Sequence, residues 1–274
     1  MSDDVEGIEV RLLLEAIHAR YGYDLRDYAA PSMRRRVLAT LATSGLPHLG
    51  ELQHRVLHDR ERFTELLEQL TVRVSDLFRD PPSFRAFRAR VVPLLRTYPF
   101  LKLWHAGCAG GEEAYASAIL MTEEGLYERC QLYATDLSQE ALRHAKEGVY
   151  PASALPAFEK NHRASGATTD LSGFVTAAYD HISMRESLRK NILFFHHDLV
   201  SDHVFGEMHV VFCKNVLIYF GRDLRDRVLQ KLAQSLCPGG FLCLGSAERL
   251  TGATPTERAF TPFSADERIY RYEP

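Results

Sequence analysis

The 274-residue sequence lacks a long hydrophobic run, a strong net charge and an ordered cysteine pattern. No apolar stretch approaches the roughly 20 residues that a membrane-spanning helix needs, and the polar segment Met1–Glu6 is unlike a secretory signal. We therefore expect a cytoplasmic protein that does not insert into a membrane. A net charge of -3 gives no long-range field for nucleic acid, so no nucleic-acid partner is expected.

The five cysteines are odd in number and have no metal-ligand spacing. Several of them lie in apolar, strand-like runs, which is typical of small buried side chains in a reducing compartment. They are Cys108, Cys130, Cys213, Cys237 and Cys243. The group His196-His-Asp198 looks like a metal cluster, but neighbouring residues of a strand point to opposite faces, so no metal is expected.

Apolar residues recur at helical spacing through the first seventy positions. They predict three helices, the second of which follows Pro31. The apolar positions are Val10, Leu13, Leu14 and Ile17, then Met33, Val37, Leu38 and Leu41, then Leu49, Leu52, Val56 and Leu57, continued by Phe63, Leu66, Leu67 and Leu70. We expect a helical bundle that forms an N-terminal domain over residues 1–72, followed by a linker helix region over residues 73–100.

From Leu101 onward, short apolar strands alternate with longer amphipathic stretches, which is typical of a doubly wound parallel α/β sheet. The predicted strands are Leu101–His105, Gln131–Thr135, Ile192–His196, His209–Cys213 and Gly240–Leu244, with an edge strand near Arg268–Tyr272. The predicted helices are Glu112–Thr122, Gln139–Lys146 and Asp223–Leu236. We expect one domain over residues 101–274, interrupted at about residues 172–192 by two or three short antiparallel strands.

A glycine-rich turn follows the first predicted strand and runs directly into a helix. Its sequence is Gly107-Cys-Ala-Gly-Gly111, and the next strand ends in the acid Asp136. Glycine lets a ligand lie against the backbone, and a carboxylate can accept hydrogen bonds from both hydroxyls of a ribose. The two features together predict a nucleoside pocket, with adenosine as the first candidate. Asp136 alone would also suit the N-terminal end of the helix that follows it.

Two glutamates, Glu112 and Glu113, stand at the start of the helix after the turn. A dinucleotide-binding turn would read G-x-G-x-x-G and leave its helix end open to a diphosphate, which two carboxylates would repel. They suit a ligand with a positive end, such as the sulfonium and amino group of S-adenosylmethionine. One of them, Glu112, suits a partner for the helix dipole, and Glu113 suits a ligand contact.

Polar residues also follow the strand that ends at Cys213, where ligands bind in such sheets. They favour a methyltransferase without naming its substrate. The chain resembles the chemotaxis-type protein-glutamate methyltransferases (CheR-type) from about Ile8 to the last strand. The motifs that carry the resemblance are Leu70–Asp80, Gly107–Tyr115, Ala134–Asp136, Asp198–Leu199 and Phe212–Phe220. The resemblance implies a helical N-terminal domain and a Rossmann-like class I methyltransferase sheet with a small inserted antiparallel β-subdomain.

The resemblance further implies methyl transfer from S-adenosylmethionine to glutamate side chains of a chemoreceptor or receptor-like protein, which leaves S-adenosylhomocysteine. Glutamate is ionised at neutral pH, with an unperturbed pKa of about 4.3, so no general base is needed. Arg79 would orient the carboxylate or the cofactor, and Tyr219 would line the transfer channel. The implied cofactor shell consists of Arg73, Ser75, Arg79, Ala106, Gly107, Glu113, Asp136, Leu137, Asp198, Leu199, Lys214 and Asn215.

Individual roles follow from the same resemblance. Glu113 would bind the methionine amino group, Asp136 the ribose hydroxyls, and Asp198-Leu199 the adenine. The run Arg34-Arg35-Arg36 would present positive charge to acidic receptor helices, although such a run is most often a solvated helix face. The inserted strands could add to a receptor tail, and the sequence leaves this open. A monomer is the default expectation.

Three positions depart from the family pattern. Family members usually have Asn at Arg73, Ser-Thr or Ala-Thr at Ala109-Gly110, and Arg at Lys214. Lysine cannot replace a guanidinium that makes two hydrogen bonds, so two alternatives stay open. One is a cofactor-binding regulatory module with little or no transfer activity. The other is a small-molecule methyltransferase, which would leave the helical domain without a purpose.

Overall fold

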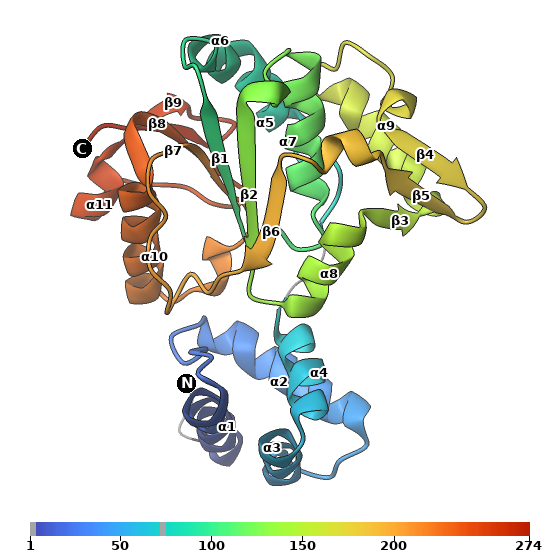
Figure 1. The fold of residues 1–274 in the computed structure, drawn as a ribbon. Helices are drawn as coiled ribbons and strands as arrows, with labels where there is room; N and C mark the ends of the chain where they lie inside the picture. The colour runs from blue at the N-terminus through green and yellow to red at the C-terminus, as the bar shows by residue number, and fades with distance from the viewer. Residues whose placement is uncertain (1–3, 72–74) are drawn as a thin grey trace. The chain divides into compact units, whose positions relative to one another are not determined.

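The computed structural model describes residues 4–71 and 75–274 (Figure 1). These residues form two units, and the chain passes between them more than once. The first unit comprises residues 1–73 and 218–228, and the second comprises residues 74–217 and 229–274.

The described part of the N-terminal segment folds into four helices. They are α1 (Val5–Tyr21), α2 (Ala30–Ser44), α3 (Leu49–His58) and α4 (Arg60–Leu70). The cap of α1 is Asp4, whose Oδ1 accepts the Gly7 N–H at 2.8 Å. Asp59 splits the third predicted helix into α3 and α4, because its carboxylate accepts the N–H groups of Glu61 and Arg62 and so starts a new helix. The predicted apolar face of α1 is buried, as a bundle requires.

The second unit is built on a seven-stranded sheet with the order β6-β2-β1-β7-β8-β10-β9. The strands are β1 (Leu101–Ala106), β2 (Cys130–Asp136), β6 (Ile192–His196), β7 (Met208–Cys213), β8 (Leu236–Leu244), β9 (Phe260–Ser264) and β10 (Ile269–Tyr272). The strands β6, β2, β1, β7 and β8 run parallel, which confirms the predicted α/β sheet. β10 is antiparallel to both of its neighbours.

The prediction of an edge strand near residues 268–272 is wrong in its position. β10 lies inside the sheet, and β9 forms the edge. Pro262 stands within β9 and cannot donate to a ladder, so the sequence pattern argued against a strand there. At an edge, the missing N–H costs little, because one side of the strand has no partner.

The remaining helices of the chain follow these strands or precede the sheet. They are α5 (Pro81–Ala86), the π-helix η1 (Phe87–Val91), α6 (Val92–Leu95), α7 (Glu112–Glu123), α8 (Gln139–Glu147), α9 (Leu155–Ala164), α10 (Arg222–Ser235) and α11 (Pro255–Arg258). Short 3-10 turns occur at Tyr127–Arg129, Ala152–Ala154, Leu171–Gly173, Glu186–Leu188 and Leu217–Tyr219. The boundary between the two units falls within α10. Figure 1 shows α7 and α8 along one face of the sheet.

A small antiparallel sheet, predicted from the sequence, is present in the second unit. Its order is β3-β5-β4, with β3 (Val149–Pro151), β4 (Val175–Ala178) and β5 (His181–Met184). β3 comes earlier in the chain than the predicted insertion, and α9 lies between β3 and β4. The apolar run after Lys190 does not join this sheet; it forms β6 of the large one.

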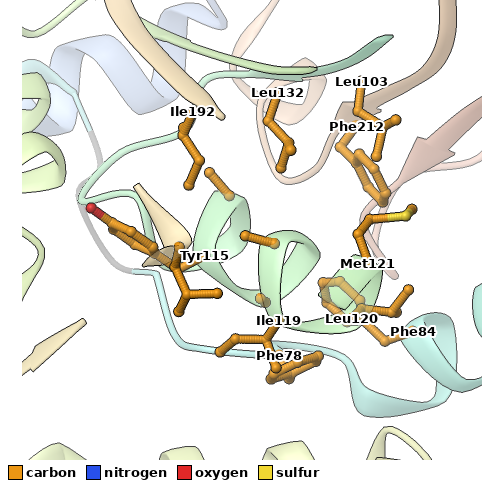
Figure 2. Packing of buried hydrophobic residues seen from close by; sticks show 14 of the residues in the cluster. Phe78, Phe84, Leu103, Tyr115, Ile119, Leu120, Met121, Leu132, Ile192 and Phe212 are labelled. Atoms are coloured by element: carbon orange, nitrogen blue, oxygen red, sulfur yellow. The ribbon is translucent and has the colours of Figure 1, made fainter. Parts of the chain in front are cut away.

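The core of the second unit surrounds α7. Figure 2 shows its side chains between the strand residues Leu103, Leu132, Ile192 and Phe212 on one side and Phe78 and Phe84 on the other. Tyr115, Ile119, Leu120 and Met121 of α7 are all at most 1% exposed. Because α7 is covered on both sides, the turn before it and the segment that carries Phe78 are held in fixed positions. The glycine-rich turn and the segment that carries Phe78 are therefore both positioned by α7.

Candidate cofactor site

The turn after β1 keeps backbone close to backbone. The N–H groups of Gly107 and Cys108 both donate to the Thr135 carbonyl on β2, at 2.9 and 2.8 Å. Gly107 is left-handed (φ 80°), and a Cβ there would lie 2.6 Å from Cγ2 of Val216, which follows β7. A side chain at this position therefore has no room. The turn thus packs closely against Val216 at the carboxyl end of β1.

Asp136, the last residue of β2, holds this turn. Its Oδ2 accepts the Ala109 N–H at 2.9 Å, and its Oδ1 accepts the Ser138 N–H at 2.9 Å. Ala109 is itself left-handed, with φ 48°. These two backbone bonds orient the Asp136 carboxylate. The structure brings together the two parts of the predicted nucleoside pocket.

Glu113, in the first turn of α7, is paired with a histidine that the sequence did not single out. Its Oε1 lies 2.9 Å from Nδ1 of His105 on β1. His105 is fully buried, and its ring stacks on Phe212 with the centroids 4.6 Å apart. Burial by itself would raise the pKa of Glu113, but the His105 hydrogen bond and the charges of Lys214 and Arg79 hold that pKa below its usual value. Glu113 is therefore ionised at neutral pH and suited to a cationic group.

The neighbouring Glu112 has different surroundings. Its side chain is buried and turns toward Gly110, where a Cβ would lie 2.8 Å from Oε1. Burial raises the pKa of Glu112 to about 7, although hydrogen bonds from its own backbone and from Ser75 oppose the rise. Oε2 is buried without a hydrogen-bond partner among the described residues. Glu113, in contrast, keeps an 18% exposed side chain, so the predicted division between the two glutamates remains a prediction that this geometry favours.

Asn215 follows β7 in a left-handed conformation, with φ 60°. The buried carboxylate of Glu248 accepts the N–H groups of Asn215 at 2.8 Å, Val216 at 3.0 Å and Gly245 at 2.7 Å. It thereby ties the segment after β7 to the segment after β8. Glu248 was not predicted from the sequence. It is recognisable there as an acid three residues after Gly245, the residue that follows the buried strand β8.

Arg79 stands in a strained turn. Phe78 and Asp80, on either side of it, are both left-handed, with φ 52° and φ 62°. Such conformations cost roughly 1–3 kcal/mol each and persist where the surroundings impose them. Here Phe78 is completely buried, and Asp80 Oδ2 accepts the Ser246 N–H at 3.3 Å. Arg79 itself is exposed, and its charge lowers the pKa of Glu113, which places the two groups in one electrostatic environment.

Lys214 points toward the segment that follows Arg79. Its Nζ donates to Ser83 Oγ at 3.1 Å and lies 4.3 Å from the centre of the Phe84 ring. The ammonium group is therefore already engaged by a hydroxyl and an aromatic face. Its influence on Glu113 is that of a nearby positive charge.

Asp198 and Leu199 follow β6, and both are buried. Asp198 Oδ1 accepts the Val200 N–H at 2.8 Å, and Oδ2 accepts the Ser201 hydroxyl at 2.9 Å. The Asp198 side chain thus shapes its own loop, and a contact with adenine would fall to the backbone and to Leu199. Two further predicted residues end neighbouring strands: Ala106 is the buried last residue of β1, and Leu137 directly follows β2.

The other predicted site residues are placed elsewhere. Tyr219, Arg34, Arg35 and Arg36 belong to the first unit, and Arg73 lies outside the described residues. Arg34 Nε donates to Glu6 at 2.7 Å and Nη2 donates to Asp4 at 2.9 Å, so Arg34 joins α2 to the start of α1. Arg35 is exposed and has no hydrogen bond or ion pair with the described part of the chain. Arg36 contacts the ring of Tyr219.

Residues 4–71 and 75–274 contain neither a candidate metal cluster nor a helix suited to span a membrane. No group of three or more His, Cys, Asp or Glu side chains in these ranges could hold a metal ion. No helix in them combines the length and the apolar character that crossing a membrane requires. The five cysteines are all free thiols.

The carboxyl ends of the parallel strands therefore carry the glycine-rich turn after β1, the acid Asp136 at the end of β2 and the ionised Glu113. A Rossmann-like sheet with this site defines the class of S-adenosylmethionine-dependent methyltransferases. Residues 73–265 match the family model described as CheR methyltransferase, SAM binding domain, and residues 8–71 match CheR methyltransferase, all-alpha domain. The chain belongs to the CheR methyltransferase family.

Individual relatives span most of this chain. It is 47% identical over 264 residues to the Pseudomonas putida protein named "Putative methyltransferase Cher3". The aligned region covers 96% of each chain. It is 29% identical over 231 residues to the chemotaxis protein methyltransferase of Listeria monocytogenes, covering 84% of this chain and 85% of that one. A 104.1 kDa protein of Rhodobacter capsulatus is 30% identical over 89% of this chain, which spans 25% of that protein. Among solved structures, the N-methyltransferase NodS of Bradyrhizobium japonicum, in complex with S-adenosylhomocysteine, has a TM-score of 0.40 and 15% identity over 81% of this chain and 97% of its own.

Proposed function

We propose that the protein is a cytoplasmic protein-glutamate O-methyltransferase that acts on a chemoreceptor or receptor-like protein. The observation that carries the proposal is that the Asp136 carboxylate holds the turn after β1 while Glu113 stands in the first turn of α7, both at the carboxyl ends of parallel strands in a chain that matches the CheR methyltransferase SAM binding domain. The relative from Listeria monocytogenes is a chemotaxis protein methyltransferase, which supports a substrate in chemotaxis.

The residues of the second unit fit S-adenosylmethionine. The turn that begins at Gly107 lies at the carboxyl end of β1, where ligands bind in such sheets, and the carboxylate of Asp136 beside it suits ribose hydroxyls. The ionised, partly exposed Glu113 suits the methionine amino group. When bound, S-adenosylmethionine would supply an electrophilic methyl group on a sulfonium.

The acceptor carboxylate needs orientation more than activation, because glutamate is already ionised at neutral pH, with an ordinary pKa of about 4.3. The exposed guanidinium of Arg79 suits the planar shape of a carboxylate and would align it for in-line attack. The left-handed residues Phe78 and Asp80 set the course of the backbone from which this side chain extends. Tyr219 would line the path of the methyl group, and Arg35 is the exposed arginine that would meet acidic receptor residues.

The test is single-turnover transfer of a tritium-labelled methyl group from S-adenosylmethionine to bacterial membranes that contain chemoreceptors. We expect label that mild alkali releases as methanol, because glutamyl methyl esters hydrolyse in base. Asp136→Asn serves as the control that should lose S-adenosylhomocysteine binding in calorimetry together with transfer.

Two results would overturn the proposal. Tight S-adenosylhomocysteine binding with no transfer would identify a regulatory module. Alkali-stable label, or label on a small metabolite instead of a membrane protein, would identify a methyltransferase with another acceptor.

A further inference from the structure

We propose that Arg36 is a positioning residue that holds the ring of Tyr219, and not a contact for the receptor. The proposal rests on the function proposed above, in which Tyr219 lines the path of the methyl group. Every residue that carries the argument lies in the first unit.

Arg36 joins two motif segments with one guanidinium. Its Cζ lies 4.6 Å from the centroid of the Tyr219 ring. Its Nη1 donates to the carbonyl of Leu70, the last residue of α4. Leu70 is also the residue at which the motif Leu70–Asp80 begins. The planar guanidinium can stack on a ring and donate in its own plane at the same time, which an ammonium group cannot do.

The backbone around Tyr219 is already fixed by the loop between α1 and α2. The Ala29 N–H donates to the Tyr219 carbonyl at 2.8 Å. The next residue, Phe220, forms an antiparallel bridge with Tyr28, and their rings meet edge to face with the centroids 5.0 Å apart. With the main chain held in this way, the principal freedom left to Tyr219 is the rotation of its side chain. Arg36 covers one face of that side chain and limits the rotation.

The three consecutive arginines have three different environments. Arg34 is neutralised by Asp4 and Glu6. Arg35 is exposed, which suits a contact with another molecule. Arg36 is half-buried and has no ion pair in the described residues. Its guanidinium contacts the Leu70 carbonyl and the Tyr219 ring. A role in binding the acidic receptor helices therefore falls to Arg35 and not to the whole run.

The first experiment tests the contact without depending on activity. The full-length protein is labelled with 3-fluorotyrosine, and the Tyr219 resonance is assigned by its loss in Tyr219→Phe. We expect Arg36→Met to shift and broaden that resonance, because the cation leaves the ring face and the ring becomes mobile. Arg35→Met should leave it in place. An unchanged resonance in Arg36→Met would overturn the proposal even if the protein turned out to have another acceptor.

The second experiment tests the consequence for transfer, with tritium-labelled S-adenosylmethionine and receptor-containing membranes. We expect Arg36→Met to lower kcat by about tenfold with little change in KM for the membranes, and Arg36→Lys to lose less. In a Tyr219→Phe background, Arg36→Met should have little further effect, because the two residues act as a unit. A raised KM with normal kcat, or fully additive losses, would show that Arg36 acts on the receptor independently of Tyr219. Absence of transfer by the unmodified protein would count against the proposed function and leave the resonance test to decide on Arg36.

Discussion

Glu112 and Glu113 are neighbours in the first turn of α7, yet their carboxyl groups are in opposite electrostatic states. Glu113 receives a hydrogen bond from His105 and the fields of two cations, while Glu112 is buried next to Gly110 and has little compensation. Two adjacent residues of a helix point about 100° apart, so one turn can offer both environments. Glu113 is therefore ionised at neutral pH, whereas Glu112 takes up a proton as the pH falls through about 7.

The state of Glu112 has a consequence for stability that depends on pH. Its pKa rises from 4.5 to about 7 on folding, so the folded chain retains a proton that the unfolded chain releases in that interval. Stability therefore falls as pH rises from 4.5 through 7, by about 3 kcal/mol at 1.36 kcal/mol per pH unit. We expect Glu112→Gln to raise the unfolding free energy by up to this amount at pH 8 and to change it little at pH 5. Urea titrations at the two pH values would test this, with the exposed Glu147→Gln as the control; an equal effect at both values would contradict it.

His105 prepares Glu113 for a ligand. Because an ionised carboxylate only accepts, the hydrogen bond requires the proton on Nδ1 of His105. We expect His105→Phe, which keeps a ring on Phe212 but loses the donor, to weaken S-adenosylhomocysteine binding by about tenfold, since a hydrogen bond to a charged group contributes about 1.5–3 kcal/mol. The loss should grow as pH falls, because the pKa of Glu113 would rise without its partner. Calorimetry from pH 5 to 8 would measure it, and His105→Asn, which restores a donor, should recover most of the affinity.

At the scale of elements, α7 also fixes its neighbours through its C-terminal end. The fully buried Glu123 accepts Arg88 Nη2 at 2.6 Å, His162 Nε2 at 3.1 Å and the Thr169 hydroxyl at 2.6 Å. These partners come from η1, from α9 and from the loop after α9. One carboxylate therefore links three separate segments of the chain.

Removing this carboxylate should destabilise the protein in a pH-dependent way. Burial opposes ionisation, but the hydrogen bonds from His162, Thr169 and Arg88 lower the pKa of Glu123 to about 2. The stabilisation is present above the ordinary pKa of 4.5 and is lost as pH falls through about 2. We expect Glu123→Gln to lower the unfolding free energy at pH 7 by about 3 kcal/mol, since it removes the buried carboxylate and leaves Arg88 with Glu124 as its remaining ion pair. Glu124→Gln leaves Arg88 paired with Glu123 and removes a more exposed carboxylate, so it should cost less than about 1 kcal/mol in the same urea titration; equal losses would contradict the argument.

Sequence patterns predicted those elements whose apolar residues alone decide their form. The five parallel strands are mainly apolar runs, and the apolar residues of α1 repeat at helical spacing. α9 was missed because it buries only Phe158 and His162, which is too weak a pattern, and β9 was missed because of Pro262. The left-handed residues Phe78 and Asn215 could not be predicted, because contacts from distant segments impose them. Glu248 escaped for the same reason, since the residues that it holds lie about thirty positions away.

At the scale of the whole molecule, the two units are connected by more than one passage of the chain. The chain passes from the second unit to the first after Leu217, in the 3-10 turn Leu217–Tyr219. It returns to the second unit after residue 228, within α10. The strand β7 and the last part of α10 therefore anchor both ends of the segment that carries Tyr219. Unfolding of the second unit would release both anchors at once. We infer that the N-terminal helices and the sheet lose their structure together.

Trp104 allows a test of this coupling, because it is the single tryptophan of the chain. It is 1% exposed on β1, and its Nε1 donates to Thr135 Oγ1 at 2.9 Å, next to Asp136, so its fluorescence reports on the second unit. At one hundred times its dissociation constant, S-adenosylhomocysteine should raise the unfolding free energy by about 2.7 kcal/mol. We expect the fluorescence transition and the far-ultraviolet circular dichroism, which also reports the helices α1–α4, to shift to higher urea by the same amount. Asp136→Asn should reduce both shifts, because it replaces one of the two carboxylate oxygens with an NH₂ donor and removes the negative charge. A circular dichroism transition whose midpoint does not change with ligand would show that the first unit unfolds independently. An unshifted Trp104 fluorescence transition would show that the nucleoside does not bind at the end of β2.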